Sequence, residues 1–340
     1  MNKRVLSYVV MAALVVAAVF TSCERYDDII NCGGSKVDVC VSVYVAGYVK
    51  GEFGKSVATL WKNGVPQSLT DGKYNAGANS VCVSGNDVYV VGYERNATVS
   101  VAKLWKNGIA QNLTDGTHAA NAHSVCVSGS DVYVVGYDNN RTVAKLWKNG
   151  VETNLTDGTK EAEAYSVCVS GNDVYVVGYE DYKVARLWKN GVIQNLDGMT
   201  FVYSVCVSGN DVYVAGMSGG DACGSNGCGL FYPALWKNGV VKNLSSAGSN
   251  WTNFYFVYLS GMNVYVAGSN KLWKNGTEQN LSGISQANSI FVSDNDVYVV
   301  GLENNYPNYT AKLWRNNILQ NLTDNTESSA NSVFVVKRNK

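Results

Sequence analysis

The chain has 340 residues, with 27 basic and 27 acidic side chains and therefore no formal net charge. This balance argues against nucleic acid as a partner, because phosphate binding needs a basic face. A hydrophobic fraction of 46% with only three prolines predicts a large buried core and argues against disorder.

The N-terminus has the pattern of a secretory signal. Lys3 and Arg4 precede an apolar run over residues 5–20, and small residues then lead to Cys23. The ending resembles the lipobox of bacterial lipoproteins, whose cysteine is acylated. The resemblance implies a signal peptide over residues 1–22, a lipidated Cys23 and a tether over residues 23–36. The protein would then be extracytoplasmic, held by lipid alone to the bacterial outer membrane on its periplasmic or cell-surface side. An ordinary signal peptide or an anchor helix is the alternative.

A short phrase, LWKNG, recurs along the rest of the chain. The phrase occurs six times, and a seventh copy reads LWRNN. Each copy has one tryptophan, and the seven are Trp61, Trp105, Trp147, Trp188, Trp236, Trp273 and Trp314. A period of about 42 residues with strand-like content is typical of a β-propeller blade.

Each repeat predicts four strands, which we name A to D. In the copy over residues 80–116, SVCVS is strand A, VYVVGY is strand B, the LWK segment is strand C, and a D strand follows the Asn-Gly turn. The array starts with a B strand and ends with a lone A strand, SVFVV. We therefore expect residues 37–340 to form an all-β, seven-bladed propeller of four-stranded antiparallel blades, with the first blade completed by the C-terminal strand. The repeat resembles kelch and WD40-type propeller repeats in general, and it does not match the signature of any one named family.

Four cysteines share one repeat position, where later copies carry Tyr or Phe: Cys82, Cys126, Cys168 and Cys206. This exchange predicts a buried apolar site and no metal ligand. Cys223 and Cys228 lie in an insertion and predict a local disulfide, because no second pair supports the alternative, a zinc site. Whether Cys32 and Cys40 pair is left open.

The turns between strands A and B and between C and D are short and uniform, whereas the B–C and D–A loops vary. We expect a ligand on the B–C/D–A face, over the central channel. The residue just before each A strand should stand at the channel mouth; in blade order these are Asn79, His123, Tyr165, Tyr203, Tyr255, Asn288 and Asn331. The alternative is that they serve only local backbone groups.

One tryptophan, Trp251, lies outside the repeated phrase, in a D–A crossover beside Tyr255. The preceding blade carries Phe231 and Tyr232 after its insertion, and Tyr203 is expected one blade earlier. Clustered aromatics on one sector of the variable face predict a binding platform. The alternative is a small hydrophobic cluster that fastens a long loop.

No catalytic motif occurs in a plausible context, and the only histidines are His118 and His123. Repeated aspartates in the turns favour a structural role. The leading hypothesis is therefore a monomeric, non-catalytic protein without cofactor or metal that binds a glycan or a protein. One alternative is a propeller-type polysaccharide lyase or glycoside hydrolase in which His123 or a carboxylate meets the substrate. Another is a structural scaffold in a surface complex.

Overall fold

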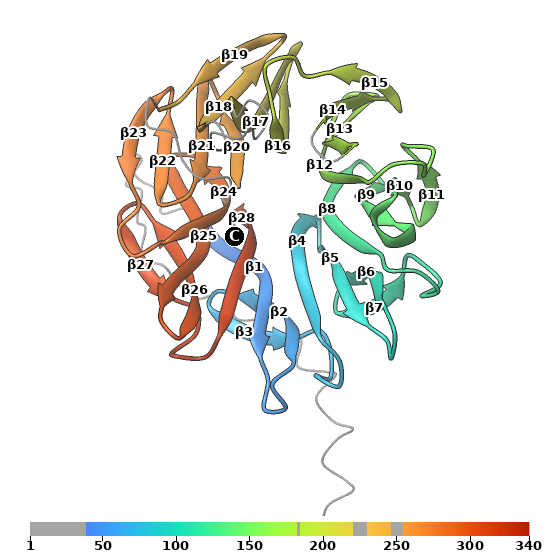
Figure 1. Cartoon of the computed structure of the whole chain (residues 1–340). Helices are drawn as coiled ribbons and strands as arrows, with labels where there is room; N and C mark the ends of the chain where they lie inside the picture. The colour runs from blue at the N-terminus through green and yellow to red at the C-terminus, as the bar shows by residue number, and fades with distance from the viewer. Residues whose placement is uncertain (1–38, 182–183, 220–229, 246–253, 340) are drawn as a thin grey trace, which may run out of the picture. The chain divides into compact units, whose positions relative to one another are not determined.

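The computed structural model describes residues 39–181, 184–219, 230–245 and 254–339. Among these residues the helical structure is limited to the short 3-10 turn η1 (Asn139–Arg141). Their strands form seven sheets of four antiparallel strands, placed as blades around a channel (Figure 1). The predicted seven-bladed propeller is confirmed.

Each blade runs from strand A at the channel to strand D at the rim. Blade 1 contains β28 (Ser328–Asn339), β1 (Val39–Lys50), β2 (Ser56–Lys62) and β3 (Val65–Ser68). Blade 2 contains β4 (Ala76–Ser84), β5 (Asp87–Arg95), β6 (Ser100–Lys106) and β7 (Ile109–Asn112). Blade 3 contains β8 (Asn121–Ser128), β9 (Asp131–Asp138), β10 (Val143–Lys148) and β11 (Val151–Asn154). Blade 4 contains β12 (Ala162–Ser170), β13 (Asp173–Glu180), β14 (Val184–Lys189) and β15 (Val192–Asn195).

The remaining three blades follow the same order. Blade 5 contains β16 (Phe201–Ser208), β17 (Asp211–Gly219), β18 (Phe231–Lys237) and β19 (Val240–Asn243). Blade 6 contains β20 (Tyr255–Ser260), β21 (Asn263–Gly268), β22 (Lys271–Lys274) and β23 (Thr277–Asn280). Blade 7 contains β24 (Gln286–Ser293), β25 (Asp296–Asn305), β26 (Asn308–Arg315) and β27 (Ile318–Asn321). All the sites described below lie within the compact unit Val43–Val336.

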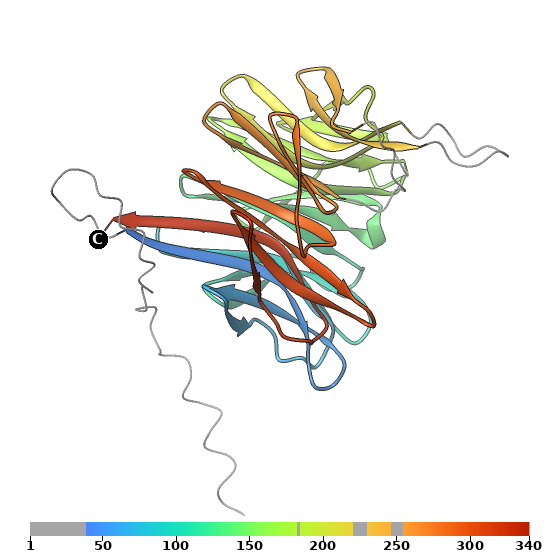
Figure 2. The same cartoon turned by 90° about the vertical axis from the view of Figure 1, so that its left-hand side faces the viewer.

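The C-terminal strand completes the first blade, as predicted. Strand β28 pairs with β1, so blade 1 joins the last strand of the chain to the first (Figure 2). Serine hydroxyls also bind blade 1 to both neighbours. Ser289 Oγ accepts a hydrogen bond from the backbone N–H of Val333, and Ser332 Oγ accepts one from Val81.

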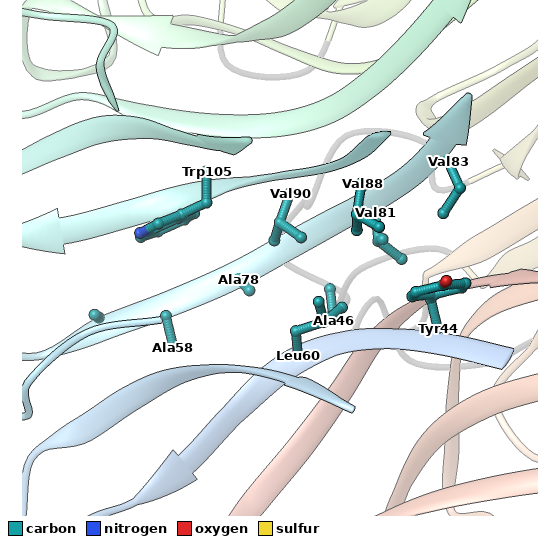
Figure 3. Close-up of a cluster of buried hydrophobic side chains, with 11 residues drawn as sticks. Tyr44, Ala46, Ala58, Leu60, Ala78, Val81, Val83, Val88, Val90 and Trp105 are labelled. Carbon is teal, nitrogen blue, oxygen red and sulfur yellow. The ribbon is translucent and has the colours of Figure 1, made fainter. Parts of the chain in front are cut away.

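Apolar packing between blades holds the ring together. Trp105 of β6 lies over Ala58 and Leu60 of the preceding blade, with Val90 beside it (Figure 3). Strand B is buried on both faces because it lies between two blades, whereas every residue of the outer strand β7 is exposed. The Trp105 indole is fully buried between the two blades, so its packing removes a large apolar area from water and is a major source of stability.

The rest of the LWKNG phrase builds the hairpin turns. Asn107 and Gly108 have φ values of 52° and 80°, as a type I′ turn requires. Asn107 Oδ1 accepts a hydrogen bond from Val88 N, and its Nδ2 donates to Asp87 Oδ1. Lys106 Nζ lies 2.8 Å from Asp87 Oδ2. The predicted structural role of the turn aspartates is therefore confirmed.

The shared cysteine position is less uniform than predicted. Cys82 is buried, whereas Cys126, Cys168 and Cys206 are half-buried, and all four are free thiols. Aromatic rings occupy this position in the A strands of blades 6, 7 and 1. The ring centroid of Phe291 lies 4.8 Å from those of Tyr258 and Phe334.

Several sequence predictions fall on residues outside the described ranges. These are the signal peptide, the lipidated Cys23, Cys32 and the expected disulfide between Cys223 and Cys228. Within the described ranges, no helix has the length and apolar character needed to cross a bilayer.

Candidate functional site

Five of the seven predicted channel-mouth residues sit on a β-bulge near the start of strand A. Strand β4 begins at Ala76, so Asn79 lies inside the strand and not before it, as the sequence had suggested. The register of β4 against β5 shifts between Ala78 and Ser80, which leaves Asn79 as the extra residue. The same shift occurs at His123, Tyr165, Tyr203 and Asn288. A bulge changes the direction of a side chain, so it can turn these residues toward the channel mouth.

A glycine in strand B makes each bulge possible. A Cβ built on Gly92 would overlap the carbonyl oxygen of Gly77 in the bulged strand. Gly136, Gly178, Gly216 and Gly301 meet the bulged strand of their own blade in the same way. Glycine has no Cβ and permits this close backbone approach, which accounts for the repeated glycine in VYVVGY.

The five bulged residues and Asn331 line one cavity of about 510 Å³, which we call the central cavity. Six of the seven predicted channel-mouth residues contribute to it: Asn79, His123, Tyr165, Tyr203, Asn288 and Asn331. The structure therefore brings together side chains from six different blades.

Asparagines form one side of the central cavity, the amide arc, in blades 7, 1 and 2. Each Nδ2 donates to the backbone carbonyl of an alanine in strand A of the next blade: Asn288 to Ala330 at 3.0 Å, Asn331 to Ala78 at 3.0 Å, and Asn79 to Ala122 at 2.8 Å. These side chains thus serve backbone groups, as the alternative interpretation held, and they also line the cavity. The hydrogen bonds hold the amides in fixed orientations.

Rings form the other side, the aromatic arc, in blades 3 to 6. The ring centroids of His123 and Tyr165 are 5.5 Å apart, and those of Tyr165 and Tyr203 are 5.9 Å apart. Phe254 meets Tyr203 edge-on at 4.9 Å. These separations fall in the range of favourable aromatic pairs. The central cavity is therefore amide on one side and aromatic on the other.

A buried carboxylate that the sequence analysis missed supports the aromatic arc. The Glu163 side chain is 4% exposed, and its Oε2 lies 3.0 Å from His123 Nε2. Its Oε1 lies 3.2 Å from Arg141 Nε and accepts a hydrogen bond from the Tyr179 hydroxyl. Burial opposes ionisation, but the His123 hydrogen bond and the Arg141 charge outweigh it and lower the pKa of Glu163. Glu163 therefore carries its charge at neutral pH and orients His123 and Arg141.

A signal for Glu163 exists in the repeat. Glu163 lies two residues before Tyr165, and the matching positions of other blades are Gly77, Asn121, Phe201, Gln286 and Ser329. A single carboxylate at a position that is uncharged in those blades marks one sector as special. Arg141 comes from η1 in the B–C loop of blade 3, where the repeat gives no alignment.

The phenols of the aromatic arc are neutral at physiological pH. Burial raises the pKa of Tyr165 and of Tyr203, and the Glu163 charge adds to the effect at Tyr165. Neutral hydroxyls can both donate and accept hydrogen bonds, so the arc offers polar edges as well as ring faces.

Tyr255 does not line the central cavity, contrary to the sequence prediction. Strand β20 pairs with β21 without a register shift, and Tyr255 lies opposite Gly268. The missing bulge moves Tyr255 into the position that Ala78 has in blade 2. Its ring fills the space above Gly268, packs 6.0 Å from Trp273 and is 1% exposed. Phe254 and Phe256 line the cavity in its place.

The predicted aromatic platform is only partly assembled. Phe231 is buried in an apolar cluster with residues of blade 6, and its ring centroid lies 5.4 Å from that of Phe201, so it belongs to the core between blades. Tyr232 is half-buried next to Gly219 and does not line the central cavity. Trp251 lies outside the described residues. Of that predicted group, Tyr203 alone is a described residue of the cavity wall.

The side chains of the central cavity suit recognition of a neutral or polar ligand by stacking and hydrogen bonding. No group of three or more His, Cys, Asp or Glu side chains within the described ranges is arranged to hold a metal ion. Among the described residues of the cavity wall, His123 and Glu163 form the one pair with the composition of an acid–base pair.

Comparison with known proteins supports the fold. No protein-family model and no curated protein matches the sequence. A puromycin-hydrolysing peptidase from Mycobacterium tuberculosis matches in structure with a TM-score of 0.50 and 11% identity, over 84% of this chain and 52% of the peptidase. The chain thus spans about half the length of that protein.

Two further structures match less closely. The β-propeller domain of the Trilobed protease from Pyrococcus furiosus has a TM-score of 0.41 and 10% identity, over 74% of this chain and 84% of that domain. TolB from Acinetobacter baumannii has a TM-score of 0.31 and 10% identity, over 68% and 61% of the respective chains. At such identities the likeness concerns the propeller fold alone.

Proposed function

We propose that this chain is a non-catalytic binding protein that recognises a glycan in the central cavity. The supporting observation is the pairing of an aromatic arc with an amide arc around one opening. A sugar ring presents an apolar C–H face and a rim of hydroxyls. Tyr165 and Tyr203 suit the face, and the amides suit the hydroxyls.

The N-terminal sequence supports a proposal for the cellular location of this binding protein. The signal-like residues 1–22 and Cys23 favour lipid anchoring at the bacterial outer membrane, with residues 23–36 as a tether. We propose that the propeller acts there as a monomer whose only tie to the membrane is the lipid. Labelling with a radioactive fatty acid tests this, because the label should enter the wild-type protein and not a Cys23→Ala variant.

Glycan binding is tested on an array of bacterial and plant oligosaccharides, followed by calorimetry on the hits. Tyr165→Ala and Tyr203→Ala should each weaken binding by about 30-fold, since losing a stacked aromatic anchor costs about 2 kcal/mol. Tyr306→Ala is the matched control, because Tyr306 is 95% exposed and does not line the cavity. Unchanged affinity in both cavity variants would place the ligand elsewhere. Capture of a protein in place of a glycan would favour the protein-binding alternative.

A second candidate is a polysaccharide lyase or glycoside hydrolase. The contact between His123 and Glu163 favours it, since a histidine oriented by a carboxylate is an effective general base. Prolonged incubation with bound oligosaccharides should then release new reducing or unsaturated ends. His123→Ala should abolish that release, whereas His118→Ala should not, because His118 is an exposed residue outside the cavity wall. Binding without any product supports the non-catalytic proposal.

A further inference from the structure

A second cavity of about 520 Å³, the lateral cavity, opens beside the central cavity in blades 1 to 3. Its wall differs in chemistry from the aromatic arc. Phenols from three successive blades contribute to it, together with three cationic side chains: Tyr48, Tyr93, Tyr137, Lys50, Arg95 and Arg141. Such a wall offers hydrogen-bond donors and positive charge.

The lateral cavity has an excess of positive charge. Glu327 is the one acidic residue among the described residues of its wall. Glu327 Oε2 lies 2.5 Å from Lys50 Nζ, so this pair is neutral as a unit. Arg95 and Arg141 remain, and Arg141 shares its charge with Glu163 of the central cavity. The excess is therefore centred on Arg95 and the exposed side of Arg141.

The two cavities share one wall residue among those described, Arg141. Arg141 lines both, and its side chain is 55% exposed. Its guanidinium lies 5.2 Å from the Tyr137 ring, which holds it at the boundary. Asn121 of the lateral wall accepts a hydrogen bond through Oδ1 from Asn79 of the central wall. Arg141 can therefore contact a ligand in either cavity.

We propose that the ligand is an acidic oligosaccharide whose carboxylate lies in the lateral cavity. This inference rests on the proposed function, because it assumes a sugar ring stacked on Tyr165 and Tyr203 in the central cavity. The neighbouring sugar then carries its carboxylate to Arg95 and Arg141. A planar carboxylate suits a guanidinium, which can donate two parallel hydrogen bonds to it. The phenols of the lateral cavity supply further donors.

The test compares the binding affinity of each acidic oligosaccharide with that of its uncharged methyl ester. Oligogalacturonate and oligoguluronate are measured beside their methyl esters, which keep the ring and lose the charge. Wild-type protein should bind at least one acid form about tenfold tighter than its ester at low salt, and the difference should shrink in 0.5 M NaCl.

Arg95→Gln separates the two cavities. Arg95 donates a hydrogen bond to the Thr98 carbonyl and does not line the central cavity, so the variant should fold and keep its affinity for the ester. We expect the preference for the acid form to fall severalfold in Arg95→Gln and to vanish when Arg141→Gln is added. Lys189→Gln removes an equal charge from the far side of blade 4 and should change neither affinity. Circular dichroism and thermal melts check that each variant is folded.

The possible failures are distinguishable. Equal binding of acid and ester by the wild type would overturn this inference and leave glycan binding intact. A preference for the acid that survives in the double arginine variant would also overturn it. Tight binding of sulfated sugars alone would replace the carboxylate by a tetrahedral anion and refute the carboxylate assignment. If no glycan of any charge binds, the proposed function itself fails.

Discussion

Trp61 donates a hydrogen bond from its indole Nε1 to the carbonyl oxygen of Leu322, at 3.2 Å and across 261 positions of sequence. The bond joins blade 1 to blade 7, at the point where the ring closes. Trp105 occupies the equivalent place in blade 2 and is equally buried, but its Nε1 has no hydrogen-bond partner among the described residues. The two tryptophans therefore differ in one hydrogen bond.

This difference predicts unequal costs for the same substitution. Trp61→Phe should destabilise the protein by about 1 kcal/mol more than Trp105→Phe, because only the first variant loses a hydrogen bond and leaves a carbonyl without its donor. Urea unfolding of both variants measures the difference. Equal losses would mean that the bond contributes nothing to closure.

The close approach at the bulge predicts a severe effect of one methyl group. Gly136→Ala would drive a Cβ into the carbonyl oxygen of Asn121, so the bulge that presents His123 must move. We expect a loss of about 3 kcal/mol, at the upper end for an overpacked core. Gly51→Ala is the control, since the nearest atom to its Cβ would be a Val57 methyl group at 3.1 Å. A normal melting temperature for Gly136→Ala would refute the role given to this glycine.

The Glu163 carboxylate predicts a pH-dependent contribution to stability. Its pKa is lowered in the folded protein, against the opposing effect of burial, by His123 and Arg141. The stabilisation is therefore complete above the unfolded pKa of about 4.3 and is lost as the pH falls through the lower folded value. Glu163→Gln should cost about 2 kcal/mol at pH 7 and much less near pH 3.

Urea titrations of wild type and Glu163→Gln at several pH values provide the measurement. Glu152→Gln serves as the control, because Glu152 is an exposed partner of Lys145 and its loss should cost under about 1 kcal/mol at either pH. A gap between wild type and Glu163→Gln that stays constant down to pH 3 would contradict the assigned ionisation.

The channel cysteines predict slow alkylation of the folded protein. Burial raises the pKa of Cys82 to about 12 and that of Cys126 to about 11, so little thiolate exists at pH 8. Iodoacetamide should leave both residues unmodified for hours in buffer and label them within minutes in 6 M guanidinium chloride. Mass spectrometry of tryptic peptides follows each site. Rapid labelling of Cys82 in the native protein would contradict this prediction, because it would show that iodoacetamide reaches the Cys82 thiol in the folded state.

The sequence predicted the propeller well because the repeat records the same physical demands in every blade. The tryptophan recurs in seven blades, the Asn-Gly turn in six and the aspartate that the turn asparagine contacts in five, and such agreement indicates one shared fold unit. The closure of blade 1 followed from the order of strands alone. Local chemistry thus sufficed for the fold.

The site was predicted only in part, for two physical reasons. Tyr255 aligns with Asn79 in sequence, but blade 6 lacks the bulge, and one missing residue moves the ring from the cavity into the core. Glu163 was missed because its importance depends on His123 of the preceding blade and on Arg141 of a variable loop. Contacts between blades do not show in a repeat that is compared one position at a time.

The bulge has a consequence for how such a protein can change. Its geometry depends on a glycine in the neighbouring strand and on backbone atoms, so the pairing of strands A and B does not depend on which side chain the bulge presents. Asparagine, histidine and tyrosine already occupy it in different blades. A gene library that varies only these codons would therefore sample new ligand preferences while the blade backbone stays the same. Natural selection could change ligand preference by the same route.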